Sequence, residues 1–272
     1  MQEVAHTSTR GIVNAAAGRN NFTLSRYEPD TRLKPFIEHY WVVRYDMIAD
    51  SSYSQTVLSY PNVHLAFEQD DDGRRALLYG IPSQPFVREL RGSGRVLGVK
   101  FRAGGFYPFW QRDVSTLTGT TISASEVFGE AADCWMNAVL DAGDEEAMAI
   151  QADTALSSCM PMRDEQAELS DRIVQAVMND RTIIRVEQMS ELTGLSIRSL
   201  QRLFRRYVGV SPKWVIRRFR LQEAAERLEQ DASVQWAELA IQLGYYDQAH
   251  FIKDFKSVLG QSPTTYRKLA ET

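Results

Sequence analysis

Two stretches of the sequence decide the fold of this chain: residues 196–215, SIRSLQRLFRRYVGVSPKWV, and residues 247–266, DQAHFIKDFKSVLGQSPTTY. Phe204 and Phe255 occupy equivalent places in them, 51 positions apart, and each is followed at the same spacing by Gly and then by Ser-Pro. A serine before a proline is a favourable start for a helix, because the serine caps it and the proline lacks only an N–H that would stay unpaired. The repeat therefore predicts two related helical units.

Each stretch follows an earlier helical segment that ends at a glycine. The predicted pairs are Val186–Thr193, Gly194 and Ser196–Tyr207 in the first unit, and Val234–Leu243, Gly244 and Asp247–Leu259 in the second. Two helices joined by a short glycine turn form a helix-turn-helix unit, whose second helix can enter the major groove of DNA. The C-terminal third is thus predicted to be all-α, with two helix-turn-helix units in tandem.

The second helix of the first unit separates apolar from basic residues. At 100° per residue, one face holds Leu200, Leu203, Phe204 and Tyr207, and the other holds Arg198, Gln201, Arg202, Arg205 and Arg206. From Arg198 to Arg220 there are eight basic residues and no acidic one, whereas an ordinary solvated helix face mixes both signs. Arginine and glutamine also suit bidentate contacts with base edges, so this face is predicted to bind DNA.

The second helix of the second unit is less basic. Its core side holds Phe251, Phe255, Val258 and Leu259, and Ala249, His250, Lys253, Lys256 and Ser257 lie opposite. The same projection puts Gln248 nearer the core side. With no carboxylate or thiolate partner evident in the sequence, His250 is interpreted as a surface polar contact and not as a metal ligand or a base.

The charge of the whole chain conceals an asymmetry. The formal net charge is -4, but residues 1–169 hold 15 Lys and Arg against 23 Asp and Glu, and residues 170–272 hold 16 against 12. An acidic body joined to a basic C-terminal third suggests that one end binds a polyanion.

These residues carry a family resemblance. Residues 170–270 resemble the DNA-binding domain of AraC/XylS-type transcription regulators, on Leu200 to Phe204 with Gly209 and Ser211-Pro212, and on Gly244-Tyr245, Phe251, Phe255-Lys256, Gly260, Ser262-Pro263 and Tyr266-Arg267. The family usually has serine and arginine where Ala249 and Lys253 stand here. The resemblance implies seven helices, a long helix near Pro212–Glu229 that ties the units together, and recognition helices in successive major grooves of double-stranded DNA.

The resemblance also assigns base-reading positions. They are Arg198, Gln201 and Arg202 in the first helix, and Gln248, His250 and Lys253 in the second. Ser196, Arg205, Arg206 and Lys256 complete the predicted set of DNA contacts, with Arg205 and Arg206 near the phosphates.

Residues 22–112 have the sequence pattern of a β domain. Short segments rich in Val, Leu and aromatic residues alternate with turns, which predicts a barrel or a sandwich. The segments are Ile37–Tyr45, Gln55–Ser59, Val63–Glu68, Ala76–Tyr79, Phe86–Leu90 and Arg95–Phe101. Residues 70–73, Asp-Asp-Asp-Gly, predict a hairpin turn.

This part resembles a cupin-like sensor domain, through Pro61 to Phe67, Gly80, Gly98 to Arg102, Gly104-Gly105-Phe106 and Pro108-Phe109. The metal-binding His-x-His set of such domains is missing, so no metal and no cofactor is expected. A small-molecule effector is one interpretation of the interior, and the candidate contacts are Tyr40, Trp41, His64, Phe67, Tyr79 and Phe101. The alternative is that these are core aromatics in a barrel that only dimerises.

Two helices are predicted after the strands, Ser125–Leu140 and Glu145–Leu156, separated at residues 141–143. An apolar stripe on the first, which includes Val127, Phe128, Trp135 and Val139, either packs on the barrel or forms a homodimer face.

The predicted organisation is α+β and multidomain. It has a flexible arm over 1–21, a cupin-like β-barrel with a helical hairpin over 22–156, a linker over 157–168, and the tandem helix-turn-helix domain over 169–272. Cys134 and Cys159 are interpreted as reduced core residues of a cytoplasmic protein, and no membrane span is expected.

The main functional hypothesis is a DNA-binding transcription regulator, activator or repressor, with RNA polymerase among its conceivable partners. A DNA-modifying enzyme is the alternative from another class. It would need an activated cysteine or a metal-bound water, and neither cysteine has such a setting.

Overall fold

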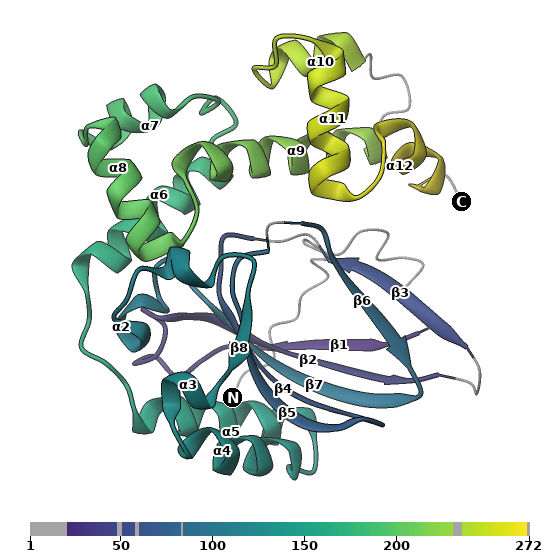
Figure 1. The fold of residues 1–272 in the computed structure, drawn as a ribbon, viewed down its shortest axis with the longest axis vertical. Helices are drawn as coiled ribbons and strands as arrows, with labels where there is room; N and C mark the ends of the chain where they lie inside the picture. Colours follow the sequence, from purple (N-terminus) through teal and green to yellow (C-terminus); the bar gives the residue numbers. More distant parts are fainter. Residues whose placement is uncertain (1–20, 48–50, 58–59, 83, 231–235, 271–272) are drawn as a thin grey trace.

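The computed structural model describes residues 21–47, 51–57, 60–82, 84–230 and 236–270; most of the predicted N-terminal arm lies outside them. The N-terminal half contains a six-stranded antiparallel sheet in the order β1-β2-β7-β4-β5-β8 and a two-stranded sheet, β3-β6 (Figure 1). The strands are β1 (Thr23–Tyr27), β2 (Ile37–Asp46), β3 (Ser52–Val57), β4 (His64–Asp70), β5 (Gly73–Tyr79), β6 (Phe86–Arg91), β7 (Ser93–Phe101) and β8 (Thr121–Ser123).

The predicted barrel is an open arrangement of two sheets, because within the described ranges no strand of one sheet pairs with a strand of the other. The predicted hairpin is confirmed: Asp70 pairs with Gly73 where β4 turns into β5. Gly73 has a φ of +116°, which an L side chain rarely adopts. Strand β8 lies where the sequence indicated only the approach to a helix, and its three residues are too few for a periodic signal.

Helices cover one face of the larger sheet: α3 (Ser125–Phe128), α4 (Ala131–Leu140) and α5 (Glu145–Ser158) (Figure 1). The predicted first helix is broken because Gly129 takes a left-handed φ of +62°. Val139 is fully buried, and the half-buried rings of Phe128 and Trp135 lie 5.0 Å apart. The apolar stripe thus packs within the chain, and Val139 cannot belong to a dimer face. Cys134 and Cys159 are both exposed, so their assignment to the core is wrong.

Two short elements follow β7: α2 (Tyr107–Trp110) and the 3-10 helix η1 (Val114–Leu117). The C-terminal part is helical and contains α6 (Glu165–Asn179), α7 (Val186–Thr193), α8 (Ile197–Leu203), a π turn η2 (Phe204–Val208), α9 (Pro212–Gln230), α10 (Trp236–Gln242), α11 (Gln248–Leu259) and α12 (Pro263–Ala270). In the described part of this region the α-helices number seven, as the resemblance implied.

Local sequence explains why the helix-turn-helix units form. Gly194 ends α7 with a φ of +67°, and the hydroxyl of Ser196 accepts a hydrogen bond from the Ser199 amide at the start of α8. In the second unit the Asp247 carboxylate accepts from the His250 amide at 2.7 Å and caps α11. Such caps satisfy amides that have no partner within the helix.

The hydrophobic core does not divide at the predicted linker. One continuous cluster joins the N-terminal domain (residues 21–158) to the first helix-turn-helix unit and includes Leu97, Leu117, Leu200, Phe204 and Val208. Its last member on α9 is Phe219. A separate cluster begins at Leu221 and holds the second unit, including Leu239, Phe251 and Phe255. The boundary between the two cores therefore crosses α9.

Candidate nucleic-acid interface and ligand cavity

Helix α8 presents its predicted DNA face to solvent. Its cap Ser196 and the side chains of Arg198, Gln201 and Arg202 are exposed, while Leu200 is fully buried beneath them. This is the arrangement that the helical periodicity predicts. Three of these side chains can offer hydrogen-bond donors to base edges, and the helix carries no carboxylate to oppose a phosphate.

The last turn of this helix differs from the prediction. The Gly209 amide donates to the carbonyl of Phe204 at 2.7 Å, so the chain closes a π turn in place of an α turn. Arg205 and Arg206 lie on this turn and contact the N-terminal domain. Arg205 Nε is 3.2 Å from Asp113 Oδ2, and Arg206 donates through Nε to the Tyr107 hydroxyl at 2.7 Å and also through Nη2.

Part of the basic run is structural. Arg218 and Arg220 are 2% exposed, and Arg220 binds Glu223 and the carbonyl of Val177. Arg217 reaches the second unit, where its Nε lies 2.8 Å from Asp254 Oδ2. Arg217 and Arg220 therefore join α9 to other helices, whereas Arg218 lies 5.8 Å from the centre of the Tyr60 ring. The basic run consequently overstates the DNA face.

Helix α11 exposes all four of its predicted contacts, Gln248, His250, Lys253 and Lys256. The helical projection placed Gln248 near the core, and that placement is wrong because the residue lies in the exposed first turn after the cap. His250 does have a carboxylate neighbour: its Nε2 lies 3.8 Å from Asp254 Oδ2, one turn further along. Asp254 thus faces both His250 and Arg217 and helps to orient this helix relative to α9.

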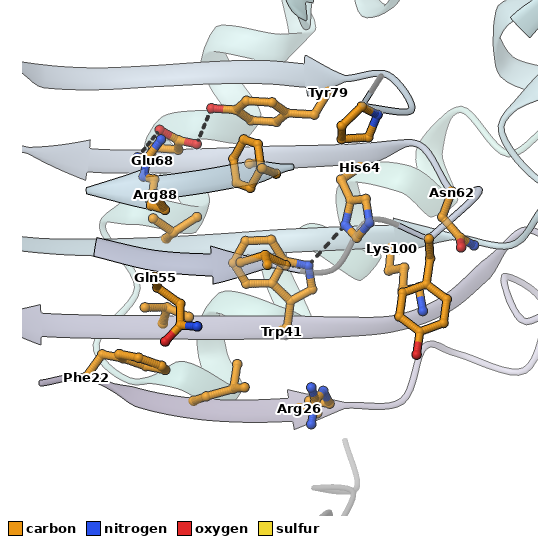
Figure 2. A pocket seen from close by; sticks show the side chains of 18 of the residues that line it. Phe22, Arg26, Trp41, Gln55, Asn62, His64, Glu68, Tyr79, Arg88 and Lys100 are labelled. Atoms are coloured by element: carbon orange, nitrogen blue, oxygen red, sulfur yellow. Dashed lines mark hydrogen bonds and ion pairs between the residues drawn. The ribbon is translucent and has the colours of Figure 1, made fainter. Parts of the chain in front are cut away.

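A cavity of about 240 Å³ lies between the two sheets of the N-terminal domain (Figure 2). Its lining is mostly apolar, with Phe22, Trp41 and Phe86 among its larger residues. Figure 2 shows the indole of Trp41 across the middle of the cavity, where its Nε1 donates a hydrogen bond to His64 Nδ1 at 3.3 Å. This size and character fit a small organic molecule.

The two ends of the cavity differ in charge. At one end Glu68, which is 3% exposed, accepts hydrogen bonds from Arg75, Arg88 and the hydroxyl of Tyr79. Arg75 also pairs with Asp70, so two carboxylates balance two arginines at this end. Burial and the Glu68 carboxylate raise the pKa of Tyr79 to about 12, so its hydroxyl keeps its proton.

The other end holds cations. Lys100 lies 2.9 Å from Glu38, and Arg26 lines the same region. Burial opposes the charge of Glu38, yet the His39 hydrogen bond and Lys100 keep the pKa of Glu38 low, at about 2. Burial, with Lys100 nearby, lowers the pKa of His64 to about 3, so its imidazole is neutral. This end consequently carries more positive than negative charge.

Alternation along the strands sorts the predicted effector contacts. Trp41, His64 and Tyr79 line the cavity. Tyr40, Phe67 and Phe101 do not: they are fully buried on the opposite face, and the Tyr40 hydroxyl donates to Asp153 of α5. Successive residues of a strand point to opposite faces, and sequence alone could not say which set faced inward.

Tyr60 connects the cavity to the helical part, a role that the sequence did not suggest. It lines the cavity, its ring lies 5.9 Å from the ring of Phe219, and its hydroxyl accepts a hydrogen bond from Gln222 at 2.9 Å. Lys100 lies over the same ring at 4.4 Å. Both Phe219 and Gln222 belong to α9, so a cavity residue contacts the helix that carries both units.

A metal site and a membrane-spanning helix are both absent from the described residues. Over the described residues, no three His, Cys, Asp or Glu side chains gather as a metal site would require. None of the helices in the same part of the chain is long and apolar enough to cross a bilayer.

Comparisons with known proteins agree with this geometry. Residues 189–269 match a family model described as a helix-turn-helix domain, and residues 25–123 match one described as a domain of unknown function, DUF6597. The HTH-type transcriptional activator AarP of Providencia stuartii is 33% identical over 99 residues, which cover 36% of this chain and 73% of AarP. The chain belongs to the AraC/XylS family of transcriptional regulators.

Other matches cover the same helical region. An uncharacterised HTH-type transcriptional regulator of Haemophilus influenzae is 38% identical over 96 residues, which are 35% of this chain and 31% of that protein. A probable AraC family regulator of Rhodopseudomonas palustris has a solved structure that is 26% identical, with a TM-score of 0.33 over 36% of this chain and 93% of that one. The chain thus spans about a third of the length of the Haemophilus relative, and the curated proteins that match its helical region are described as transcriptional regulators.

Proposed function

We propose that this AraC/XylS-family chain recognises a double-stranded operator with α8 and α11 and that a small molecule in the N-terminal cavity controls it. The observation that carries the DNA part is the exposed row of Arg198, Gln201 and Arg202 on α8, with no acidic residue on that helix. The second helix adds Gln248, His250 and Lys253 to the reading set. Base contacts give discrimination, while phosphate contacts by residues such as Lys256 give affinity.

The test compares affinities for an operator selected from genomic fragments with affinities for a scrambled duplex. Arg202→Ala should cost about 1–3 kcal/mol on the operator and relax the preference at one base pair, as expected for a lost bidentate contact. Lys253→Ala should cost less. Arg91→Ala, which removes an equal charge from strand β6, is the matched control and should leave the preference unchanged. An equal loss on both duplexes for Arg202→Ala would make α8 a phosphate clamp only.

The effector part of the proposal rests on the shape and charge of the cavity. An apolar molecule with one acidic group fits, because its body would lie against Trp41 and Phe86 and its acid beside Arg26 and Lys100. Such a ligand would also lie next to Tyr60, whose contacts with α9 offer a route from cavity to DNA-binding helices.

A matched pair of probes tests the cavity. 4-Phenylbutyrate and 4-phenylbutan-1-ol share an apolar body and differ in the acid, and a bound ligand raises the melting temperature by mass action. The acid should give the larger shift, and Ala66→Leu, which narrows the cavity, should abolish it. The absence of a shift with either probe in the native protein would count against a ligand of this size and chemistry.

We also propose that the chain forms a homodimer and that RNA polymerase is a further partner. A homodimer would place two pairs of recognition helices on one operator, and linkage raises affinity without any new contact. Ile150, Met160 and Met162 are exposed apolar residues near α5 and suit such an interface, so light scattering of the native chain and of Ile150→Glu tests it. Contact with RNA polymerase would make the chain an activator. The chain would act in the cytoplasm, where the DNA that it regulates lies.

A further inference from the structure

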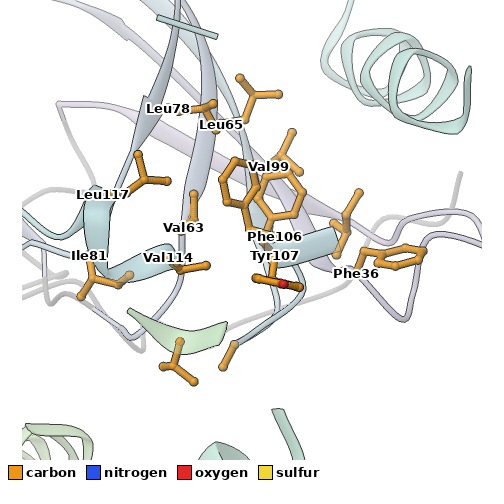
Figure 3. Packing of buried hydrophobic residues seen from close by; sticks show 14 of the residues in the cluster. Phe36, Val63, Leu65, Leu78, Ile81, Val99, Phe106, Tyr107, Val114 and Leu117 are labelled. Atoms are coloured by element: carbon orange, nitrogen blue, oxygen red, sulfur yellow. The ribbon is translucent and has the colours of Figure 1, made fainter. Parts of the chain in front are cut away.

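The N-terminal domain contacts the C-terminal end of the first recognition helix through a small, well-defined interface. The Thr118 hydroxyl donates to the carbonyl of Gly209 at 2.7 Å. Ile81, Val114 and Tyr107 face the green ribbon of the first unit in Figure 3. A Cβ placed on Gly209 would lie 2.8 Å from Ile81 Cδ1 and 3.1 Å from Val114 Cγ1, so the two surfaces are in close contact.

Two arginines of the predicted DNA surface are held at this interface. Arg206 donates two hydrogen bonds to the Tyr107 hydroxyl, and its guanidinium carbon lies 5.0 Å from the centre of the Tyr107 ring. The Tyr107 and Tyr207 rings pack at 4.2 Å, which fixes the phenol in place. Arg205 pairs with Asp113, whose side chain is 39% exposed. We name these four residues, Tyr107, Asp113, Arg205 and Arg206, the arginine clamp.

The two arginines that contact the N-terminal domain both lie in the π turn. Arg205 and Arg206 are within the turn that the Gly209 amide closes onto the Phe204 carbonyl. Single π turns within helices often mark functional positions. Here the turn gives two cations of the DNA surface partners on another domain.

The partners of these arginines are weaker than a DNA phosphate. Tyr107 offers a neutral phenol oxygen, and the exposed Arg205–Asp113 pair is screened by solvent. A phosphate accepts charge-assisted, bidentate hydrogen bonds from a guanidinium, which are shorter and stronger. Exchange of one partner for the other is therefore favourable, but it has to break the contacts of the clamp first.

We propose that Tyr107 and Asp113 are positioning residues of the DNA-binding machinery, which hold Arg206 and Arg205 in the free protein and yield them to DNA phosphates on binding. This inference rests on the proposed DNA-binding function and on the prediction from the sequence that Arg205 and Arg206 lie near the DNA phosphates. It makes the N-terminal domain a competitor for the phosphate-binding groups of the first recognition helix. Any change that shifts Tyr107 or Asp113 would then alter DNA affinity without touching a base-reading residue.

A set of double-mutant cycles on the full chain tests the inference, with a random-sequence 30-base-pair duplex as the probe, because phosphate contacts do not depend on sequence. Tyr107→Phe and Asp113→Asn should each raise the affinity for this duplex at 50 mM salt by about two- to fivefold, the range expected when an arginine that solvent reaches loses one partner. The gain from Tyr107→Phe should vanish in an Arg206→Gln background. The gain from Asp113→Asn should vanish in an Arg205→Gln background.

Thr118→Val is the control for a merely loosened interface, since it removes the bond to Gly209 and leaves the clamp intact; it should not raise affinity. The inference is overturned if Thr118→Val gives the same gain, if the clamp variants bind no better than the native chain, or if their gains persist without the arginines. A native chain that fails to bind any duplex at 50 mM salt would instead refute the proposed DNA-binding function, and this inference with it.

Discussion

His64 shows how a single residue of the cavity ties stability to pH. Burial lowers its pKa to about 3 in the folded protein, whereas in the unfolded chain it titrates near 6.5. Below pH 6.5 the unfolded chain therefore binds a proton that the folded chain does not, and the free energy of unfolding decreases as the pH falls. This contribution of His64 is complete above pH 6.5 and is lost progressively down to about pH 3.

We accordingly expect His64→Asn to flatten the acid side of the stability curve. The slope from this one group is at most about 1.4 kcal/mol per pH unit, so the variant should lose less stability than the native chain between pH 6 and pH 4. Chemical denaturation at several pH values measures it. His250→Asn is the matched control, because His250 is exposed on α11. Parallel curves for the native chain and His64→Asn would contradict the buried, neutral histidine.

At the scale of single residues, sequence reasoning succeeded where a side chain depends on local periodicity and did less well where it depends on a distant contact. The exposed positions of Arg198, Gln201 and Arg202 follow from helical spacing alone. Arg218 and Arg220 have the same chemistry in the same basic run, yet α9 buries them against other elements. No local pattern distinguishes an arginine that binds DNA from one that supports a helix junction.

At the scale of elements, a glycine caps the C-terminal end of four of the described helical segments, α3, α7, η2 and α11, and these glycines have different surroundings. Gly194 and Gly209 both have positive φ, +67° and +92°. A Cβ at Gly194 would meet nothing within 4 Å, whereas at Gly209 it would meet Ile81 of the N-terminal domain. The two positions therefore separate the cost of backbone strain from the cost of crowding between domains.

Gly194→Ala should destabilise the chain by about 1–2 kcal/mol, the cost of a left-handed residue that carries a Cβ. Gly209→Ala should cost more, because Ile81 and Val114 must also move. Thermal unfolding of both variants makes the comparison. Equal losses would mean that the N-terminal domain does not pack against η2 in solution.

The elements themselves could be predicted from the sequence to a large extent. Helical spacing and caps located α7 and α11 closely, the family resemblance located α9, and turn residues located most strands. Strand β8 and the π turn η2 escaped because each is set by tertiary contacts: β8 by its pairing with β5, and η2 by Gly209 and its neighbours in the N-terminal domain. The prediction of a closed barrel was wrong for a related reason, since the sequence pattern of a strand does not specify which strand edges pair.

At the scale of the whole molecule, the two hydrophobic cores predict two units of unfolding. The N-terminal domain and the first helix-turn-helix unit share one core, and the second unit has its own. We therefore expect the proposed division into a regulatory half and a DNA-binding half to differ from the division into cooperative units of unfolding.

Three equivalent truncations test this division by calorimetry. Leu97→Ala, Leu200→Ala and Leu239→Ala each remove a buried leucine at a cost of about 2–5 kcal/mol. Leu97→Ala and Leu200→Ala should lower the same transition, although one residue lies in β7 and the other in α8. Leu239→Ala should lower the other transition. If Leu200→Ala moved together with Leu239→Ala, the boundary between the cores would lie before α8 and not within α9.

Because α9 contributes residues to both cores, its length determines how the two helix-turn-helix units are rotated relative to each other. Each residue of an α-helix turns the chain by about 100° and advances it by about 1.5 Å. One residue inserted between Arg220 and Leu221 would keep the apolar residues of each core together. It would break the contacts of Arg217 with Asp254 and of Gln222 with Tyr60, and it would rotate α11 by about a quarter of a turn around α9 relative to α8. Seven inserted residues would nearly restore the angle but would separate the two recognition helices by about 10 Å more. Under the proposed function, the length of this helix would thus set the spacing and the relative orientation of the two DNA segments that one chain contacts.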